Sequence, residues 1–224
     1  MAKQFPQVGA LVLCGGSSVR MGYDKWRLPV AEQTLLEYIV RPILQDCGEV
    51  VVCCGDRQID AAIDQVTFVQ DEYEACGPLE GIRAGLAKLS SGYEFAYVTA
   101  CDVPYFYTDV LRLLLDSLAD KEAAIPVRGG STERVFGMTS VYRTSVHEKI
   151  GRLVDTKQLR VAQLAQTLDT ARVDIEAIRE VDPDLNCLSN INTPSEYFAW
   201  LEQMGFHCSD EIRQMLKKND DRQI

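Results

Sequence analysis

The sequence predicts a three-layer α/β/α protein with a mainly parallel central sheet. Short apolar segments alternate along the chain with longer segments of helical spacing, and this rhythm is typical of a parallel sheet covered by helices on both faces. The first apolar segment, 8–14, indicates a fully buried strand. The expected strands are 8–14, 49–54, 67–70, 95–100, 123–127 and 138–142, and the expected helices are 35–47, 81–89, 109–118, 146–153 and 159–168.

Local signals mark several helix boundaries. Gly48 follows the segment 35–47 as a stop signal, and Pro42 is expected to kink that helix. Asp109 is the expected N-cap of the helix 109–118. Near the end of the chain, Thr193 followed by Pro194 and Glu196 predicts another helix start, with Thr193 as N-cap.

Length and composition indicate an ordinary globular protein. The 224 residues fit one large α/β domain or two small ones, and 46% hydrophobic with 25% charged residues is a usual balance. We expect a single domain over residues 1–224. The polar, charged stretch 217–224 is expected to be frayed.

The net charge of −10 argues against a nucleic-acid-binding protein, which usually carries a basic face. A small-molecule substrate is expected instead, and a polyphosphate would need a local cationic site. The chain has no apolar run of about 18 residues, and its first residues lead straight into a strand-like segment rather than a signal peptide. We therefore expect a cytoplasmic protein that binds no membrane.

The cysteines and histidines give little support to a metal, redox or hydrolase site. No C-x-x-C pair and no zinc-like spacing occurs, so the thiols are expected to be small buried or half-buried residues. The two histidines, His147 and His207, lie beside no obvious nucleophile. The eight cysteines are Cys14, Cys47, Cys53, Cys54, Cys76, Cys101, Cys187 and Cys208.

Glycines and acidic residues follow the ends of several predicted strands. Gly15 and Gly16 come directly after the first strand, and Gly55 follows the second. Asp71 and Asp102 follow two further strands. Ligands of open α/β sheets bind outside the carboxyl ends of the strands. These residues are therefore expected to converge on one ligand-binding edge.

The strongest local signal is the segment 13–25. Gly15 and Gly16 allow a ligand to approach the backbone closely, and free N–H groups in such a turn form an anion-binding nest. Arg20 and Lys25 add positive charge, which suits phosphoryl groups. The segment matches neither a Walker loop nor the dinucleotide motif G-x-G-x-x-G. The alternative is a plain glycine-rich turn with solvated charges.

Three further groups of residues are candidates for ligand contacts. Asp102, at the tip of a central strand, is a natural Mg²⁺ ligand, although a turn or N-cap role is the alternative. Asp71, with Gly77-Pro78 after it, could accept hydrogen bonds from a nucleobase or ribose, or be solvated in a loop. Asn190 and Asn192 could bind a polar ligand or satisfy backbone groups.

Together these residues resemble the molybdenum cofactor guanylyltransferases. The family's loop Leu-Ala-Gly-Gly-x-Ser-x-Arg-Met-Gly-x-Asp-Lys matches residues 13–25, with Cys14 in place of Ala. Its Gly-Pro-Leu-x-Gly-Ile matches 77–82, Cys-Asp-x-Pro matches 101–104, and Asn-x-Asn-Thr-Pro matches 190–194. The matches occur in the same order and cover most of the chain.

The resemblance implies a Rossmann-like nucleotidyltransferase fold and a set of residue roles. Leu13, Cys14, Gly15, Gly16, Asp71, Gly77 and Pro78 would bind the nucleotide together with Lys25 and Asp102. Arg20, Lys25 and Asp102 would be catalytic, and Asp102 would bind Mg²⁺. Asn190 and Asn192 would face the acceptor. The nucleotide half would span about 1–105 and the acceptor half about 106–205.

The implied activity is Mg²⁺-dependent transfer of GMP from GTP to molybdopterin, with transient handover partners for the cofactor. The alternatives are a relative that uses CTP or another nucleotide with molybdopterin or a sugar or polyol phosphate, and a non-catalytic nucleotide-binding protein of the same fold. The chain departs from the family on the acceptor side, where residues 133–138 lack the usual Pro-Leu and the run 156–160 carries fewer arginines.

Overall fold

The computed structural model describes the backbone of most of the chain. The described residues are 2–15, 21–55, 59–61, 63–73, 77–129, 133–157 and 160–220, the side chains of 217–220 excepted.

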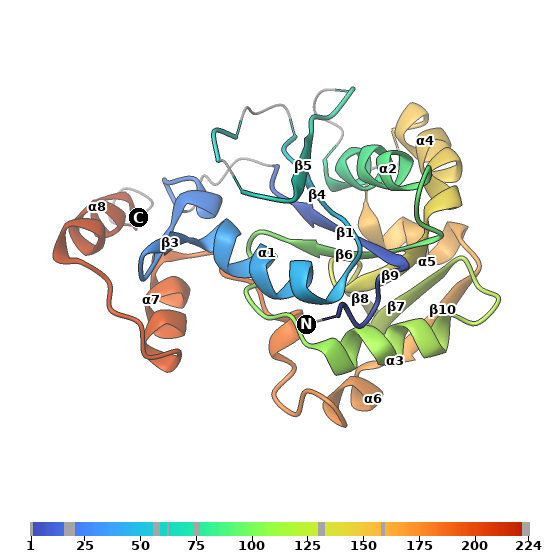
Figure 1. The fold of residues 1–224 in the computed structure, drawn as a ribbon. Helices are drawn as coiled ribbons and strands as arrows, with labels where there is room; N and C mark the ends of the chain where they lie inside the picture. The colour runs from blue at the N-terminus through green and yellow to red at the C-terminus, as the bar shows by residue number, and fades with distance from the viewer. Residues whose placement is uncertain are drawn as a thin grey trace.

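A central sheet of eight strands runs through the described part of the molecule (Figure 1). Its order is β10-β7-β9-β6-β1-β4-β5, and the short β8 pairs with β7. A separate hairpin pairs β2 (Pro29–Val30) with β3 (Gln33–Thr34). The strands of the main sheet are β1 (Val8–Leu13), β4 (Val50–Cys53), β5 (Val66–Val69), β6 (Phe95–Ala100), β7 (Ala123–Arg128), β8 (Arg134–Val135), β9 (Ser140–Arg143) and β10 (Thr170–Asp174).

Most pairs in this sheet are parallel, as expected. The four neighbours β5, β4, β1 and β6 all run in the same direction, and β10 is parallel to β7. The exceptions are β8, which is antiparallel to β7, and β9, which is antiparallel to both β6 and β7 and joins the two parallel parts. The carboxyl ends of β5, β4, β1 and β6 therefore lie at one edge of the sheet.

Helices cover both faces of the sheet. They are α1 (Leu35–Asp46), α2 (Pro78–Leu89), α3 (Thr108–Leu118), α4 (His147–Asp155), α5 (Leu164–Thr167), α6 (Ile175–Arg179), α7 (Pro194–Gln203) and α8 (Asp210–Asp220). Short 3₁₀ turns precede or connect them: η1 (Lys25–Arg27), η2 (Thr144–Val146), η3 (Val161–Gln163) and η4 (Asn186–Leu188).

The two cores on either side of the sheet follow from the alternation of side chains along each strand. In β1, Val12 belongs to the core that contains residues of α1 and α3, such as Leu36 and Leu114. The next residue, Leu13, belongs to the other core, which contains α2 residues such as Ile82. This division confirms the three-layer α/β/α arrangement.

Helix α2 lies unusually close to the sheet because it presents glycines to it. A Cβ atom at Gly85 would lie 2.6 Å from Leu11 Cδ2 and 2.7 Å from Cys53 Sγ. A Cβ at Gly81 would lie 3.1 Å from Leu13 Cδ2. The amino-terminal half of α2 is thereby pressed against the ends of β1 and β4.

A buried ion pair fixes the loop that precedes α2. Glu80 has no solvent exposure, and its carboxylate accepts bonds from Arg83 Nε at 2.7 Å and Arg83 Nη2 at 2.8 Å. Glu80 also accepts the backbone N–H of Glu72 at 3.1 Å, while Arg83 binds the Glu72 carboxylate at 2.6 Å. The hydrogen bonds that Arg83 donates to Glu80 raise the pKa of Arg83 above its usual range. The segment after β5 is thus tied to α2.

Several expectations need correction. Asp109 is not an N-cap: it lies inside the first turn of α3, after the cap residue Tyr107, and pairs with Arg112. The expected helix 159–168 is instead the turn η3 followed by the short α5, and residue 159 lies outside the described residues. Strand β10 and the β2–β3 hairpin were not expected.

Other expectations agree with the structure where it describes them. Pro42 lies inside α1, and Thr193 caps α7. Helix α8 continues to Asp220, into the stretch expected to be frayed, and residues 221–224 lie outside the described residues. Among the helices that the structure describes, none combines the length and apolar character needed to span a bilayer.

The described cysteines are buried or half-buried, as expected. Cys208 is the half-buried one among them, and Cys76 lies outside the described residues. Burial raises the pKa of Cys47 to about 12 and that of Cys54 to about 11, so both stay protonated at neutral pH. The remaining buried thiols are Cys14, Cys53, Cys101 and Cys187.

We predict that Arg83→Ala lowers the free energy of unfolding by about 3 kcal/mol, because it leaves the Glu80 carboxylate buried without its partner. Urea unfolding followed by circular dichroism measures the change. The control is Lys149→Ala, which removes a more exposed pair with Glu122 and should cost at most about 1 kcal/mol. Equal effects of the two substitutions would contradict this account of the pair.

Candidate functional site

Four polar side chains from distant parts of the sequence meet beyond the carboxyl ends of β1 and β6. Lys25 Nζ lies 2.7 Å from Asp102 Oδ2 and donates to Asn192 Oδ1 at 2.9 Å. Asn190 Nδ2 donates to Asp102 Oδ1 at 3.0 Å. The Lys25 and Asp102 side chains are only 14% and 18% exposed. The four residues form one continuous hydrogen-bonded group, which we call the Lys25–Asp102 cluster.

The strands position the aspartate. The backbone N–H of Cys101 donates to the Leu13 carbonyl at 2.8 Å, which extends the β1–β6 pairing past the strand end. Asp102 follows, and its carbonyl accepts the N–H of Ile191 at 2.8 Å. The segment that carries the two asparagines is therefore fixed to Asp102 by its backbone as well as by a side chain.

The start of α7 positions the asparagines. Glu196 Oε2 accepts the backbone N–H groups of Asn192 at 2.6 Å and Thr193 at 3.0 Å, while Thr193 Oγ1 accepts the N–H of Glu196 at 3.2 Å. This capping box satisfies the helix start. The side chains of Asn190 and Asn192 are left to bind Asp102 and Lys25.

The predicted phosphate loop is described only at its two ends. Cys14 donates its N–H to the Cys53 carbonyl at 2.7 Å, and a Cβ at Gly15 would lie 3.0 Å from Gly55 Cα. The turns after β1 and β4 thus lie backbone to backbone, and a side chain at Gly15 would press on Gly55. Gly16 and Arg20 lie outside the described residues.

Leu13 contributes to the site through its backbone. Its side chain is 8% exposed and packs in the core under α2, while its carbonyl accepts the N–H of Cys101. Contact between Leu13 and a nucleobase stays a prediction.

Asp71 and the Gly77-Pro78 pair lie at the same edge, next to the start of α2. The Asp71 N–H donates to the Gly55 carbonyl at 2.9 Å, and a Cβ at Gly81 would lie 3.7 Å from Asp71 Oδ1. Gly77 caps α2 with φ +64° and ψ −160°, a region essentially confined to glycine. Pro78 then takes the first helical position.

The donor set at Asp102 fits a hard divalent cation that is shared with a phosphorylated ligand. Among the residues that the structure describes, no group of three or more His, Cys, Asp or Glu side chains could hold a metal by itself. Mg²⁺ is commonly bound by one or two carboxylates, with waters and substrate phosphates completing its shell. Asp102 could supply one such carboxylate.

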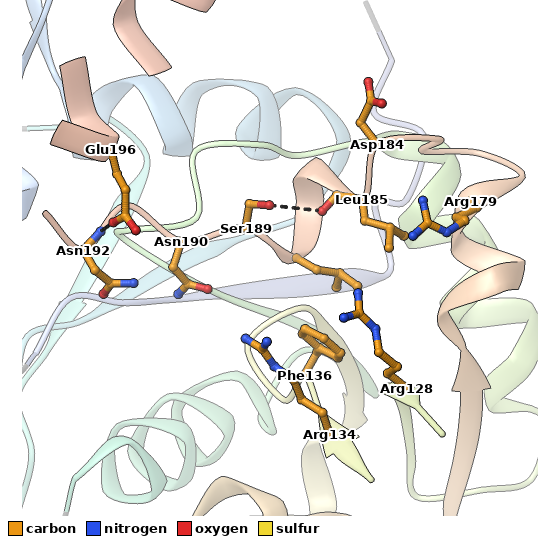
Figure 2. Close-up of a pocket in the computed structure, with 11 residues that line it drawn as sticks. Arg128, Arg134, Phe136, Arg179, Asp184, Leu185, Ser189, Asn190, Asn192 and Glu196 are labelled. Carbon is orange, nitrogen blue, oxygen red and sulfur yellow. Dashed lines mark hydrogen bonds between the residues drawn. The ribbon is translucent and has the colours of Figure 1, made fainter. Parts of the chain in front are cut away.

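A pocket of about 420 Å³ adjoins the Lys25–Asp102 cluster (Figure 2). Asn190, Asn192 and Glu196 line it near the cluster. Sequence reasoning missed the other polar lining residues, which are Arg128, Arg134, Arg179, Asp184 and Ser189. The sequence did contain a signal for Arg128, because this residue ends an apolar strand, much as Asp102 follows one.

Comparison with known proteins assigns the chain to a family. A family model described as the MobA-like NTP transferase domain matches residues 10–172. The chain belongs to the MobA-like NTP transferase family. It is therefore a nucleotidyltransferase, and the family ties it to molybdenum cofactor biosynthesis.

Relatives across most of the chain support this assignment. A probable molybdenum cofactor guanylyltransferase of Methanosarcina mazei is 32% identical over 91% of this chain and 92% of its own. One from Mycobacterium marinum is 31% identical over 84% and 90%. The crystal structure of molybdopterin-guanine dinucleotide biosynthesis protein A from Archaeoglobus fulgidus shares the fold, with a TM-score of 0.69 at 21% identity, over 88% of this chain and 98% of that one.

We predict that Gly77→Ala destabilises this member of the family by about 1–3 kcal/mol, because alanine is strained at the backbone angles of Gly77. The matched control is Gly92→Ala, where an added Cβ likewise meets nothing within 4 Å but no positive φ is required. Thermal unfolding compares the two variants. Equal melting temperatures would show that the start of α2 tolerates a side chain.

Proposed function

We propose that this chain transfers GMP from GTP to molybdopterin in a Mg²⁺-dependent reaction that forms the guanine dinucleotide cofactor and pyrophosphate. The observation that carries the proposal is the Lys25–Asp102 cluster. It joins the strand ends on the nucleotide side to the asparagines that line the adjacent pocket. The names of the relatives supply the two substrates.

In the proposed reaction, a phosphate oxygen of molybdopterin attacks the α-phosphorus of GTP. A new P–O bond forms as the bond from the α-phosphorus to the bridging oxygen of pyrophosphate breaks, in line with the attack. The acceptor phosphate is already ionised at neutral pH, so no strong general base is required. In keeping with this, the proposal gives His147 no part in the reaction, and its Nδ1 is hydrogen-bonded to the Thr144 carbonyl at 2.9 Å.

The proposed roles of Lys25 and Asp102 rest on their positions, and that of Arg20, which lies outside the described residues, rests on the family's loop motif. Lys25 and Arg20 bind triphosphate oxygens and offset the negative charge that develops on them. Asp102 holds Mg²⁺, and Asn190 and Asn192 keep Asp102 and Lys25 in place beside the acceptor. When bound, Mg²⁺ supplies positive charge to the phosphoryl oxygens.

The remaining nucleotide contacts are proposed at the same edge of the sheet. Cys14, Gly15 and Gly16 present backbone groups to the phosphates, and Leu13 lies beside the guanine. Asp71, with Gly77 and Pro78, binds the nucleoside. Residues 1–105 then form a nucleotide-binding half and residues 106–205 an acceptor-binding half of one domain. The reaction is placed in the cytoplasm, where transient partners hand over the labile pterin.

We predict that purified protein with Mg²⁺ releases pyrophosphate from GTP only when molybdopterin is present, and that Asp102→Asn lowers kcat at least about a hundredfold by removing the carboxylate that holds the metal. A coupled pyrophosphate assay measures both. The control is Asp116→Asn, an exposed acid of α3 far from the cluster in the fold, which should leave kcat unchanged.

Nucleotide choice is tested separately by thermal shift with GTP, CTP, UTP and ATP. The four nucleotides differ only in their base, so any difference in stabilisation reports on base recognition. A guanylyltransferase should be stabilised most by GTP. Turnover of CTP equal to that of GTP would refute the guanylyl specificity. Full activity of Asp102→Asn would refute the metal-binding role of Asp102 and leave the specificity open to the nucleotide panel.

A further inference from the structure

The pocket beside the Lys25–Asp102 cluster is lined by three arginines. In Figure 2, Asn190 and Asn192 lie on the left, Arg128 and Arg179 on the right, and Arg134 below. The lining contains two carboxylates, Asp184 and Glu196, against these three guanidinium groups. Glu196 is already engaged by two backbone N–H groups at the start of α7. The pocket therefore has a small excess of positive charge in a chain of net charge −10.

Two of the arginines are held opposite each other by the sheet. Arg128 ends β7 and Arg134 begins β8, and the two are direct partners in the antiparallel register. Directly opposed residues of an antiparallel pair project from the same face, and like charges at such positions destabilise the sheet. The arrangement therefore has an electrostatic cost that an anion between the two side chains would offset.

No carboxylate among the described residues forms an ion pair with either arginine. The ion pairs that the structure describes include neither Arg128 nor Arg134. The neighbouring Glu133 binds Arg172 instead. Arg134 lies over the Phe136 ring at 4.8 Å from its centroid, a contact that orients the guanidinium and leaves its N–H donors available.

The third arginine approaches from a separate element and is positioned by the backbone. Arg179, at the end of α6, donates to the Pro183 carbonyl at 2.9 Å and pairs with the exposed Glu176 at 3.2 Å. The next wall of the pocket contains Leu185, a buried non-glycine residue with φ +56° and ψ 34°. Strained backbone of this kind is concentrated at ligand-binding sites.

We propose that Arg128, Arg134 and Arg179 form a second anion site, which binds an anionic group of the acceptor other than the phosphate that attacks the nucleotide. The proposal rests on the proposed function in one respect: the reacting phosphate lies at the Lys25–Asp102 cluster. The acceptor is then anionic at both ends. Guanidinium groups suit this role because they bind oxyanions through two parallel N–H bonds.

The pocket also restricts the size and polarity of the part of the acceptor that lies between its two anionic groups. Phe136, Leu185 and Leu188 give its lining an apolar part, and about 420 Å³ is the size of a small-molecule site rather than a peptide groove. The substrate class is accordingly a compact molecule with an apolar or planar middle and an anionic group at each end.

One residue of the second anion site lies in a stretch where the chain departs from its family. Arg134, with the lining residue Phe136, belongs to the stretch 133–138, which lacks the usual Pro-Leu. The altered stretch therefore still lines the pocket.

The direct test is an NMR titration of the arginine Nε–Hε signals with inorganic phosphate and, in a separate arm, molybdate. The protein is first saturated with Mg²⁺ and a non-hydrolysable GTP analogue, so that the nucleotide site is not available to the added anion. The Arg128 and Arg134 signals, assigned from Arg128→Gln and Arg134→Gln, should shift saturably. The signal of Arg152, an exposed residue of α4, should not.

Each glutamine variant should raise the dissociation constant of the anion at least about tenfold, since hydrogen bonds to charged groups contribute that much. Arg128→Lys, which keeps the charge but loses the paired N–H geometry, should restore part of the binding. Saturable shifts with phosphate alone, or with molybdate alone, both support the site and identify which oxyanion it prefers. Absence of shifts at Arg128 and Arg134, or unchanged affinity in both variants, would overturn the proposal.

Steady-state kinetics separate this proposal from the proposed function. Arg128→Gln and Arg134→Gln should raise the KM for molybdopterin at least about tenfold while the KM for GTP stays the same, and Arg152→Gln should change neither. Unchanged acceptor KM in an active enzyme overturns the second anion site and leaves the guanylyltransferase intact. If the enzyme turns over no GTP with molybdopterin, the proposed function fails and the NMR titration still decides the anion site.

Discussion

The ion pair between Lys25 and Asp102 is the contact on which the candidate site depends. It joins residues 77 positions apart in the chain, and Asn192, 167 positions from Lys25, binds the same ammonium group. Each of these residues is also held by its own element: η1, the end of β6 and the start of α7. Because both charged side chains are largely buried, each needs the other until a ligand provides new partners.

Close backbone packing places the rest of the nucleotide edge against this pair. Gly15 lets the turn after β1 touch the turn after β4, and Gly85 lets α2 approach β1 and β4. The buried Glu80–Arg83 pair then fixes the loop before α2. Small residues and one internal salt bridge therefore set where the backbone N–H groups can meet a phosphate.

The fold was predictable where local pattern dominates, and much of the site's geometry followed from it. The apolar runs of β1 and β6 identify the central strands, and Asp102 lies beside the end of β1 as strand-end convergence predicts. The contacts of Asn190 with Asp102 and of Asn192 with Lys25 were not expected. The two-residue β8 is too short for a periodic signal, and the antiparallel β9 depends on tertiary pairing. Arg128 and Arg134 become neighbours only through that pairing, so the cationic wall could not be inferred from spacing.

The pairing of β7 with β8 is separate from the strand pairs that form the proposed nucleotide edge. The side-chain period of a strand is two, so a slip of one residue in β8 would turn Arg134 away from the pocket. Neither β7 nor β8 pairs directly with β1, β4 or β6, the strands whose ends form the proposed nucleotide edge. If the proposed second anion site binds the acceptor, its substrate choice can be re-engineered in a two-residue strand without altering the strands that carry Asp102 and the glycine turns.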